Sequence, residues 1–202
     1  MTVLIGLGLG PGDPELLTLR AVRLLREADA VFVPGGIAQG LVAPYRDPEV
    51  LPFPMTGDEE AIRHAIEDAA GKIARVAGSG TAVFALLGDP NVYSTWARLL
   101  AVMQERYPAI GCRTVPGVSS VTAFASVAGI TLSGGFSVSD GKGERGRILL
   151  KVRRPRKEAE RLAREGFTEF ILVERMFLDG ERVYRGELPE RSTYFSILYA
   201  GR

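Results

Sequence analysis

The chain has few of the side chains on which many enzymes and metalloproteins depend. Its 202 residues include one histidine and one cysteine, which excludes a multi-histidine metal site and an internal disulfide. No apolar run approaches the roughly 18 residues of a membrane span, and the apolar start lacks the basic segment of a signal peptide. The formal net charge of +1 argues against a dedicated nucleic-acid binder. We therefore expect a soluble cytoplasmic protein with no metal site.

Glycine is abundant, and charge is unevenly distributed. There are 24 glycines, about 12% of the chain against an average of about 7%. Residues 1–114 carry 10 basic and 13 acidic side chains, net −3, whereas residues 115–202 carry 15 and 11, net +4. The basic excess is concentrated between Lys142 and Lys157. It fits an anionic small-molecule partner, and a solvated surface explains it equally well.

The first half of the chain predicts a parallel α/β arrangement, because short apolar strands alternate with helical patterns. Strands are expected at residues 3–9, 30–33, 81–87 and 111–115, with mostly loop over 34–58 and a short strand near 50–53. Asp13 is expected to cap the first helix, and Thr56 with Glu59 has capping-box spacing for the next. His64 lies off the apolar stripe of that second helix and is interpreted as a surface residue.

The second half predicts a more mixed sheet. Strands are expected at 136–139, 148–152, 169–175, 182–185 and 194–199, with one helix over about 155–165. Asp179-Gly180 is a hairpin signal. We place the boundary where the pattern changes, which gives an N-terminal α/β domain of residues 1–114 and a C-terminal mixed-sheet α/β domain of residues 115–202.

Familiar nucleotide-binding and nucleophile motifs do not fit. The glycines from Gly6 to Gly12 fail G-x-G-x-x-G in both registers, and no acidic residue ends the second strand. Gly71-Lys72 lies inside a helical pattern and is no P-loop. The segment Gly117–Val121 lacks the second glycine of a nucleophile elbow. With His64 as the only histidine, a Ser-His-Asp triad is also disfavoured.

Three glycine-bearing turns remain, each after an expected strand and before a helix. They are Gly8-Leu9-Gly10-Pro11-Gly12-Asp13, Gly88-Asp89-Pro90-Asn91-Val92-Tyr93-Ser94-Thr95 and Pro116-Gly117-Val118-Ser119-Ser120. Ligands of open α/β sheets bind at this edge, and glycine lets the backbone approach a flat ligand. As turn chemistry alone, the three segments fit a purely structural role equally well.

Taken together, the motifs resemble those of the tetrapyrrole (precorrin) methyltransferases. The match covers nearly the whole chain: V-x-x-G-x-G-P-G-D-P-E-L-L-T-x-x-A, the G-D-P-x-x-Y turn, V-P-G-V-S-S followed by A-G-I, and the closing Y-F-S-I-L. Two segments are similar to the precorrin-2 C(20)-methyltransferases in particular. They are Phe53-Pro54-Met55-Thr56, and Gly88-Asp89-Pro90 followed by Tyr93-Ser94-Thr95.

The resemblance implies a fold and a set of contacts. The fold is two α/β domains with a cofactor cleft between them, usually as a homodimer, with S-adenosylmethionine in the cleft and the tetrapyrrole over it. The implied cofactor contacts are Pro11 in the first turn, Leu87, Gly88, Asp89 and Val92 beside the methionine part, Ser119 and Ser120 in the third turn, and Leu150, Met176 and Tyr194 around the adenosine.

The implied chemistry agrees with the scarcity of nucleophilic side chains. The sulfonium carries an activated methyl group and the electron-rich meso carbon is its own nucleophile, so the protein must align the two and exclude water. A base must then remove the meso proton. Tyr93 and Asp89 are candidates for that base, as are water and a substrate carboxylate. Tyr93 and Arg175 are candidate substrate contacts.

Carboxylates on the substrate favour basic side chains at the mouth of the cleft. The candidates are Lys142, Arg145, Arg147, Lys151, Arg153 and Arg175. For residues 153–157 we favour a solvated helix start, although basic side chains there oppose the helix dipole. Residues 133–147 are also shorter than the corresponding segment of the family, so part of the substrate wall is either missing or supplied by a dimer mate.

The leading hypothesis is an S-adenosylmethionine-dependent methyltransferase that acts on the C-20 meso carbon of precorrin-2 or cobalt-precorrin-2 (cobalt-factor II) in cobalamin biosynthesis. One alternative is methylation of another ring carbon or another tetrapyrrole. A second is a non-catalytic tetrapyrrole- or cofactor-binding protein. A nucleotide-dependent oxidoreductase comes third, because its fingerprint fails. The sequence does not decide whether the ring carries cobalt.

Overall fold

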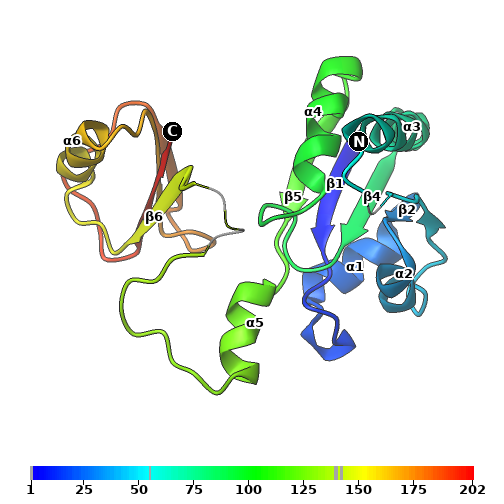
Figure 1. Cartoon of the computed structure of the whole chain (residues 1–202), viewed down its shortest axis with the longest axis horizontal. Helices are drawn as coiled ribbons and strands as arrows, with labels where there is room; N and C mark the ends of the chain where they lie inside the picture. The colour runs from blue at the N-terminus through cyan, green and yellow to red at the C-terminus, as the bar shows by residue number, and fades with distance from the viewer. Residues whose placement is uncertain (1, 55, 139–140, 142) are drawn as a thin grey trace. The chain divides into compact units, whose positions relative to one another are not determined.

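A computed structural model of the chain describes all residues except 1, 55, 139, 140 and 142. The chain divides into two compact units, Met1–Gly135 and Phe136–Arg202, and Figure 1 labels many of their helices and strands. Within the described residues, no helix combines the length and the apolar character needed to cross a bilayer.

The described part of the first unit contains a five-stranded parallel sheet. Its strands are β1 (Val3–Gly8), β2 (Ala30–Val33), β3 (Glu49–Val50), β4 (Thr81–Leu86) and β5 (Gly111–Val115). Their order is β3-β2-β4-β1-β5, and the pairings are parallel. The carboxyl ends of β4, β1 and β5 therefore lie beside one another at one edge. The α/β fold class with a parallel sheet is confirmed.

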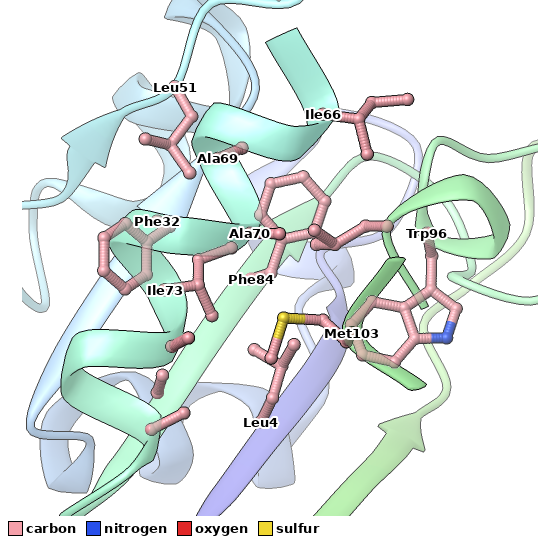
Figure 2. Packing of buried hydrophobic residues seen from close by; sticks show 14 of the residues in the cluster. Leu4, Phe32, Leu51, Ile66, Ala69, Ala70, Ile73, Phe84, Trp96 and Met103 are labelled. Carbon is pink, nitrogen blue, oxygen red and sulfur yellow. The ribbon is translucent and has the colours of Figure 1, made fainter. Parts of the chain in front are cut away.

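Helices cover both faces of this sheet, because alternate strand residues point to opposite sides. One face packs on α3 (Glu59–Ala77) and α4 (Trp96–Arg106), where Phe32 and Phe84 form the centre of the core. Figure 2 shows these rings together with Trp96 and Met103 of α4. The other face packs on α1 (Leu19–Glu27) and α2 (Gly36–Val42). The central strands β1, β2 and β4 are consequently buried on both sides, as their continuous apolar runs predict, whereas β3 and β5 at the two edges alternate with exposed residues.

The helix starts differ from those predicted. Asp13 caps only a 3-10 turn, η1 (Pro14–Leu16), because Leu17 is extended and interrupts the helical pattern. Thr18 then caps α1, and its Oγ1 accepts a hydrogen bond from the Ala21 amide at 3.1 Å. In the same way Asp58, not Thr56, caps α3 and accepts from two amides.

Residues 34–58 also hold more structure than the loop predicted for them. Helix α2 lies in this segment, because Ala38, Leu41 and Val42 bury against the sheet. The high content of glycine and proline in this segment predicts loop, so its short apolar stripe was not recognised as a helix.

The described part of the second unit contains a four-stranded antiparallel sheet. Its strands are β6 (Gly146–Leu150), β7 (Glu169–Glu174), β8 (Arg182–Arg185) and β9 (Ser196–Gly201), in the order β6-β9-β7-β8. Helix α6 (Pro155–Arg164) covers one face and buries Leu162 against Leu172, Leu198 and Ala200. The mixed sheet predicted for this half is therefore corrected, since the described pairings are all antiparallel.

Two further expectations differ from the structure. Residues 136–138 are exposed and form no strand, while Ser139 lies outside the described residues. The two compact units divide between Gly135 and Phe136, later than the boundary expected at residue 115. The physical reason is that β5 pairs with β1 and the Gly117 amide is bonded to Asp89, so the chain stays attached to the first unit beyond residue 115.

Candidate functional site

Three glycine-bearing turns meet at the carboxyl ends of β1, β4 and β5. Gly10 and Gly88 exchange backbone hydrogen bonds, from the Gly10 amide at 3.3 Å and from the Gly88 amide at 2.7 Å. A Cβ placed on Gly8 would lie 2.4 Å from the Gly117 nitrogen, and one on Gly117 would lie 2.4 Å from the Gly88 oxygen. Side chains at Gly8 and Gly117 are therefore excluded by backbone on both sides. The convergence predicted from the sequence is present within the first unit.

Asp89 fixes the second turn to the third. Its Oδ1 accepts from the Asn91 amide at 2.8 Å and its Oδ2 accepts from the Gly117 amide at 3.2 Å. Asn91 adds a second link, because its Nδ2 donates to Thr114 Oγ1 at 3.2 Å. Both carboxylate oxygens of Asp89 thus hold backbone in place, which makes this residue a structural tie at the centre of the site.

The surface next to this tie has the composition of a small-molecule contact. Leu87 is 38% exposed and Val92 is 39% exposed, so each presents an apolar side chain beside the turn. Gly88 has φ +71°, a conformation that favours glycine, and a Cβ built there meets no atom within 4 Å. Pro11 is half-buried in the neighbouring turn. Open backbone flanked by apolar side chains fits a ligand with both polar and apolar parts.

Tyr93 stands in the same turn in an uncommon conformation. Its φ is +46° and it is 66% exposed. The following residue braces the turn, because the Ser94 hydroxyl donates to the Pro90 carbonyl and accepts from the Trp96 amide. A non-glycine residue at positive φ is costly unless its surroundings impose it. Tyr93 is therefore held at the surface of the turn where the sequence placed a candidate substrate contact.

The two serines of the third turn differ in their surroundings. The Ser119 Oγ accepts from the Val121 amide at 3.3 Å, which caps α5 (Ser120–Val127) as the sequence predicts. Ser120 is exposed at the first position of that helix. Ser119 and Ser120 lie two and three residues after Gly117. Six of the expected cofactor contacts, together with Gly88 itself, are therefore gathered at one sheet edge of the first unit. These six are Pro11, Leu87, Asp89, Val92, Ser119 and Ser120.

The expected adenosine contacts of the second unit gather at one end of its sheet. Leu150 ends β6, Met176 follows β7 and Tyr194 precedes β9, and all three are exposed. Backbone bonds hold these segments side by side, because the Lys151 amide donates to the Ser196 oxygen at 2.8 Å and the Arg175 amide donates to the Phe195 oxygen at 2.7 Å.

The basic candidates divide into committed and exposed side chains. The Arg147 guanidinium bonds to Glu144 and to Glu165, and hydrogen bonding to Arg147 lowers the pKa of both carboxyls. Arg147 is therefore a structural bridge. Arg145, Lys151, Arg153 and Arg175 are exposed, while Lys142 lies outside the described residues. His64 is exposed on α3 with its Nε2 3.7 Å from Glu60, which confirms it as a surface residue.

Sequence reasoning missed two features that position the site. The link from Asn91 to Thr114 was not foreseen, although an Asx residue directly after Gly-Asp-Pro is a turn signal. Trp96 stacks on Gly6, where a Cβ would lie 2.7 Å from the indole carbons. A glycine in the middle of an apolar strand is the available signal for such a close approach.

Comparisons with known proteins agree on one family. The sequence matches the family model described as Tetrapyrrole (Corrin/Porphyrin) Methylases over residues 3–191. It is 34% identical over 136 residues to the probable cobalt-precorrin-2 C(20)-methyltransferase of Methanocaldococcus jannaschii, which covers 63% of this chain and 57% of that protein. It is 33% identical over 153 residues to the precorrin-2 C(20)-methyltransferase of a Sinorhizobium species, which covers 67% of this chain and 61% of the relative.

The chain spans less than two thirds of the length of these relatives. Its fold is similar to that of a solved structure, precorrin-6Y methylase from Archaeoglobus fulgidus, with a TM-score of 0.51 and 20% identity. That alignment covers 100% of this chain and 99% of the other, which supports the fold over the full length.

Proposed function

The chain belongs to the tetrapyrrole (corrin/porphyrin) methylase family, and from this premise we propose that it is an S-adenosylmethionine-dependent C-methyltransferase of the C-20 meso carbon of precorrin-2 or cobalt-precorrin-2 in cobalamin biosynthesis. The position on the ring is supported by relatives at 33–34% identity whose names carry that reaction. The observation that carries the proposal is the meeting of the Gly8, Gly88 and Gly117 turns at one sheet edge.

The residues at this edge fit the methyl donor. Bound S-adenosylmethionine supplies an activated methyl group on a cationic sulfur. In this proposal Leu87, Gly88, Asp89 and Val92 contact its methionine part, and Pro11, Ser119 and Ser120 complete the contacts of the first unit. The adenosine contacts of the second unit are Leu150, Met176 and Tyr194. The open backbone at Gly88 permits the methionine part of the donor to approach the chain closely.

The protein's own part in the reaction is to bind, orient and exclude water. Orientation of two bound reactants lowers the barrier by several kcal/mol without any covalent step on the enzyme. Asp89 contributes by holding the second and third turns together. No side-chain nucleophile is needed, and this agrees with an exposed His64 and a half-buried Cys112.

Removal of the meso proton needs a base. Both oxygens of Asp89 already accept backbone hydrogen bonds, which weakens its case for this role. We favour Tyr93, water or a substrate carboxylate, and Tyr93 with Arg175 are the proposed substrate contacts. We also propose that the protein acts in the cytoplasm as a homodimer.

Methyl transfer to a defined substrate tests the proposal. Precorrin-2 is incubated with the protein and S-adenosylmethionine carrying a ¹³C-methyl group, with and without cobalt in the ring. We expect the labelled methyl group to replace one meso hydrogen, a net gain of one ¹³CH₂, with a single labelled carbon attached at C-20. Label at another ring carbon supports the first alternative, and unchanged mass in both metal states rejects methyl transfer.

A binding measurement separates the remaining alternatives. Calorimetry is expected to show S-adenosylhomocysteine binding and no NAD binding. That result would exclude the hypothesis of a nucleotide-dependent oxidoreductase. Binding of S-adenosylhomocysteine and of tetrapyrrole without any gain of mass would instead support a non-catalytic protein. Light scattering over a concentration series tests the homodimer.

A further inference from the structure

Two cationic residues of the second unit flank the start of β9 from opposite sides. Lys151 follows β6 and donates its amide to the Ser196 oxygen at 2.8 Å, and Arg175 follows β7 and donates its amide to the Phe195 oxygen at 2.7 Å. Since β6 and β7 are the two neighbours of β9, Lys151 and Arg175 stand two strand spacings apart, about 10 Å.

Both residues have a left-handed backbone. The φ of Lys151 is +59° and that of Arg175 is +52°. Glycine adopts this region freely, whereas a long side chain does so at a cost that only the surroundings can impose. Such residues cluster at ligand-binding positions. Two of them on either side of one strand, both basic, point to a role for the side chains themselves.

No carboxylate neutralises either charge within the described part of the chain, although each charged group has one contact in the fold. Among the described residues, neither makes an ion pair, whereas Arg147, Arg156 and Arg161 each pair with a glutamate. The Lys151 Nζ lies 5.1 Å from the centre of the Tyr194 ring. The Arg175 Nε donates to the Asp179 carbonyl, which orients the guanidinium.

Two glutamates near these residues are engaged elsewhere. Glu174 is buried and accepts from the hydroxyls of Ser192 and Tyr184. Glu181 accepts from the Phe177 amide. Lys151 and Arg175 thus present positive charge at the same end of the sheet as two exposed aromatic rings.

One of these rings, Phe195, is not an expected cofactor contact, and it supplies exposed apolar surface directly before β9. Tyr194 and Phe195 are exposed and pack edge to face, with ring centres 5.5 Å apart. A ligand that suits this end of the sheet has a broad apolar body and at least two anionic groups. Because the two cations extend from backbones two strand spacings apart, we expect each to take a separate anionic group of one molecule.

We propose that Lys151 and Arg175 form a two-point anchor for separate carboxylates of a single polycarboxylate macrocycle. This identification rests on the proposed function, under which that ligand is the tetrapyrrole substrate with its peripheral acid side chains. Of the six basic residues that the sequence suggested as substrate contacts, this proposal selects two. Both lie at the same end of the second sheet and both have a left-handed backbone.

Glycine substitutions provide a test that does not depend on mutant misfolding. Lys151→Gly and Arg175→Gly remove the charges while relaxing the backbone, so we expect unfolding midpoints at or above that of the parent protein. The probe is uroporphyrin, an octacarboxylic porphyrin, titrated into the full chain and followed by its fluorescence. Lys157→Gln is the matched control, because it removes an exposed cation of the same unit on α6.

We expect each glycine substitution to weaken uroporphyrin binding about fivefold and the pair to weaken it about 25-fold. Arg175→Lys is expected to recover part of the loss, and Lys157→Gln to change affinity less than about twofold. Added salt should weaken the parent more than the double variant. Parent-like affinity in the double variant, or no uroporphyrin binding by the parent, overturns the anchor.

The anchor and the proposed function fail in different ways. If the parent methylates precorrin-2 and the double variant does so with an unchanged KM for precorrin-2, the anchor is wrong and the function stands. If the parent transfers no methyl group but its uroporphyrin binding depends on both charges, the function is wrong and the anchor stands.

Discussion

Asp89 and Gly117 are 28 positions apart in the sequence and are joined by a 3.2 Å hydrogen bond from the Gly117 amide to the Asp89 carboxylate. This bond connects the turn after β4 to the turn after β5, while the backbone bonds between Gly10 and Gly88 connect the turn after β1. The three turns are therefore linked to one another by hydrogen bonds, and we expect a change in one to affect the other two.

Replacement of Asp89 by alanine is expected to weaken the link between the second and third turns. The Asn91 and Gly117 amides lose their acceptor, and a lost hydrogen bond to a charged group costs about 1.5–3 kcal/mol of unfolding free energy. We also expect weaker binding of S-adenosylhomocysteine. Urea unfolding measures the first effect and calorimetry the second.

Two comparisons make the Asp89 result specific. Asp89→Asn keeps an acceptor oxygen and similar size, so it should fall between the parent and the alanine variant. Asp47→Ala removes an exposed carboxylate elsewhere in the first unit. It should change neither the unfolding free energy nor the affinity for S-adenosylhomocysteine. Parent-like S-adenosylhomocysteine affinity in Asp89→Ala would show that the donor does not bind at these turns.

A methyl group on Gly117 is expected to force the turns apart. In Gly117→Ala the new Cβ would lie 2.4 Å from the Gly88 oxygen and 2.7 Å from the Gly8 carbonyl carbon. Backbone on both sides cannot yield as a flexible side chain does, so we expect a loss of about 1–3 kcal/mol and no measurable S-adenosylhomocysteine binding. Gly40→Ala is the control, because a Cβ there meets nothing within 4 Å and alanine is favoured inside α2. Equal stability of the two variants contradicts the packing described.

The sequence was informative where chemistry is local. The apolar runs of β1 and β4, the strand β5 and the Ser119 cap follow from patterns of a few residues, and each is present. The Gly-rich turns were recognised for the same reason. Their common edge followed from parallel topology, since carboxyl ends of neighbouring parallel strands lie together.

Features that depend on distant partners were not predictable in the same way. Thr18 replaced Asp13 as the cap of α1 because packing at Ala21 and Leu25 decides where that helix begins. The antiparallel pairing of β6 with β9 joins segments at opposite ends of the second unit, so strand propensity alone did not reveal it. The sequence makes Arg147 a candidate substrate contact, whereas in the structure its guanidinium is bonded to Glu144 and Glu165.

Acid is expected to destabilise the second unit through Arg147. Hydrogen bonds from its guanidinium lower the pKa of Glu144 and of Glu165 below their ordinary value of 4.5. A carboxyl whose pKa is lowered by folding stabilises the fold above its unfolded pKa, and that contribution is lost as the pH falls through the folded pKa. Thermal unfolding followed by circular dichroism should therefore show a midpoint that drops as the pH falls below about 4.5.

The Arg147 contribution can be separated from other carboxyls by subtraction. Arg147→Gln removes the common partner, so its unfolding midpoint should fall less between neutral and acid pH than that of the parent. Arg164→Gln removes an exposed arginine from the last turn of α6 and should keep the parental pH dependence. Identical pH profiles in the parent and Arg147→Gln would show that the bridge does not contribute.

The contact between Gly6 and Trp96 is expected to set the position of α4 and so of the turn that precedes it. Trp96 is 2% exposed, and its indole carbons lie 2.7 Å from where a Gly6 Cβ would stand. Gly6→Ala should therefore cost about 1–3 kcal/mol of unfolding free energy through overpacking.

Trp96→Phe removes ring volume and also a buried Nε1 that has no hydrogen-bond partner among the described residues, so its cost should be smaller than that of truncation to alanine. In the double variant the added methyl group occupies space that the smaller ring leaves, and we expect its loss to be less than the sum of the two single losses. Urea unfolding followed by circular dichroism measures all four proteins, and strictly additive losses would show that the two residues are not in contact.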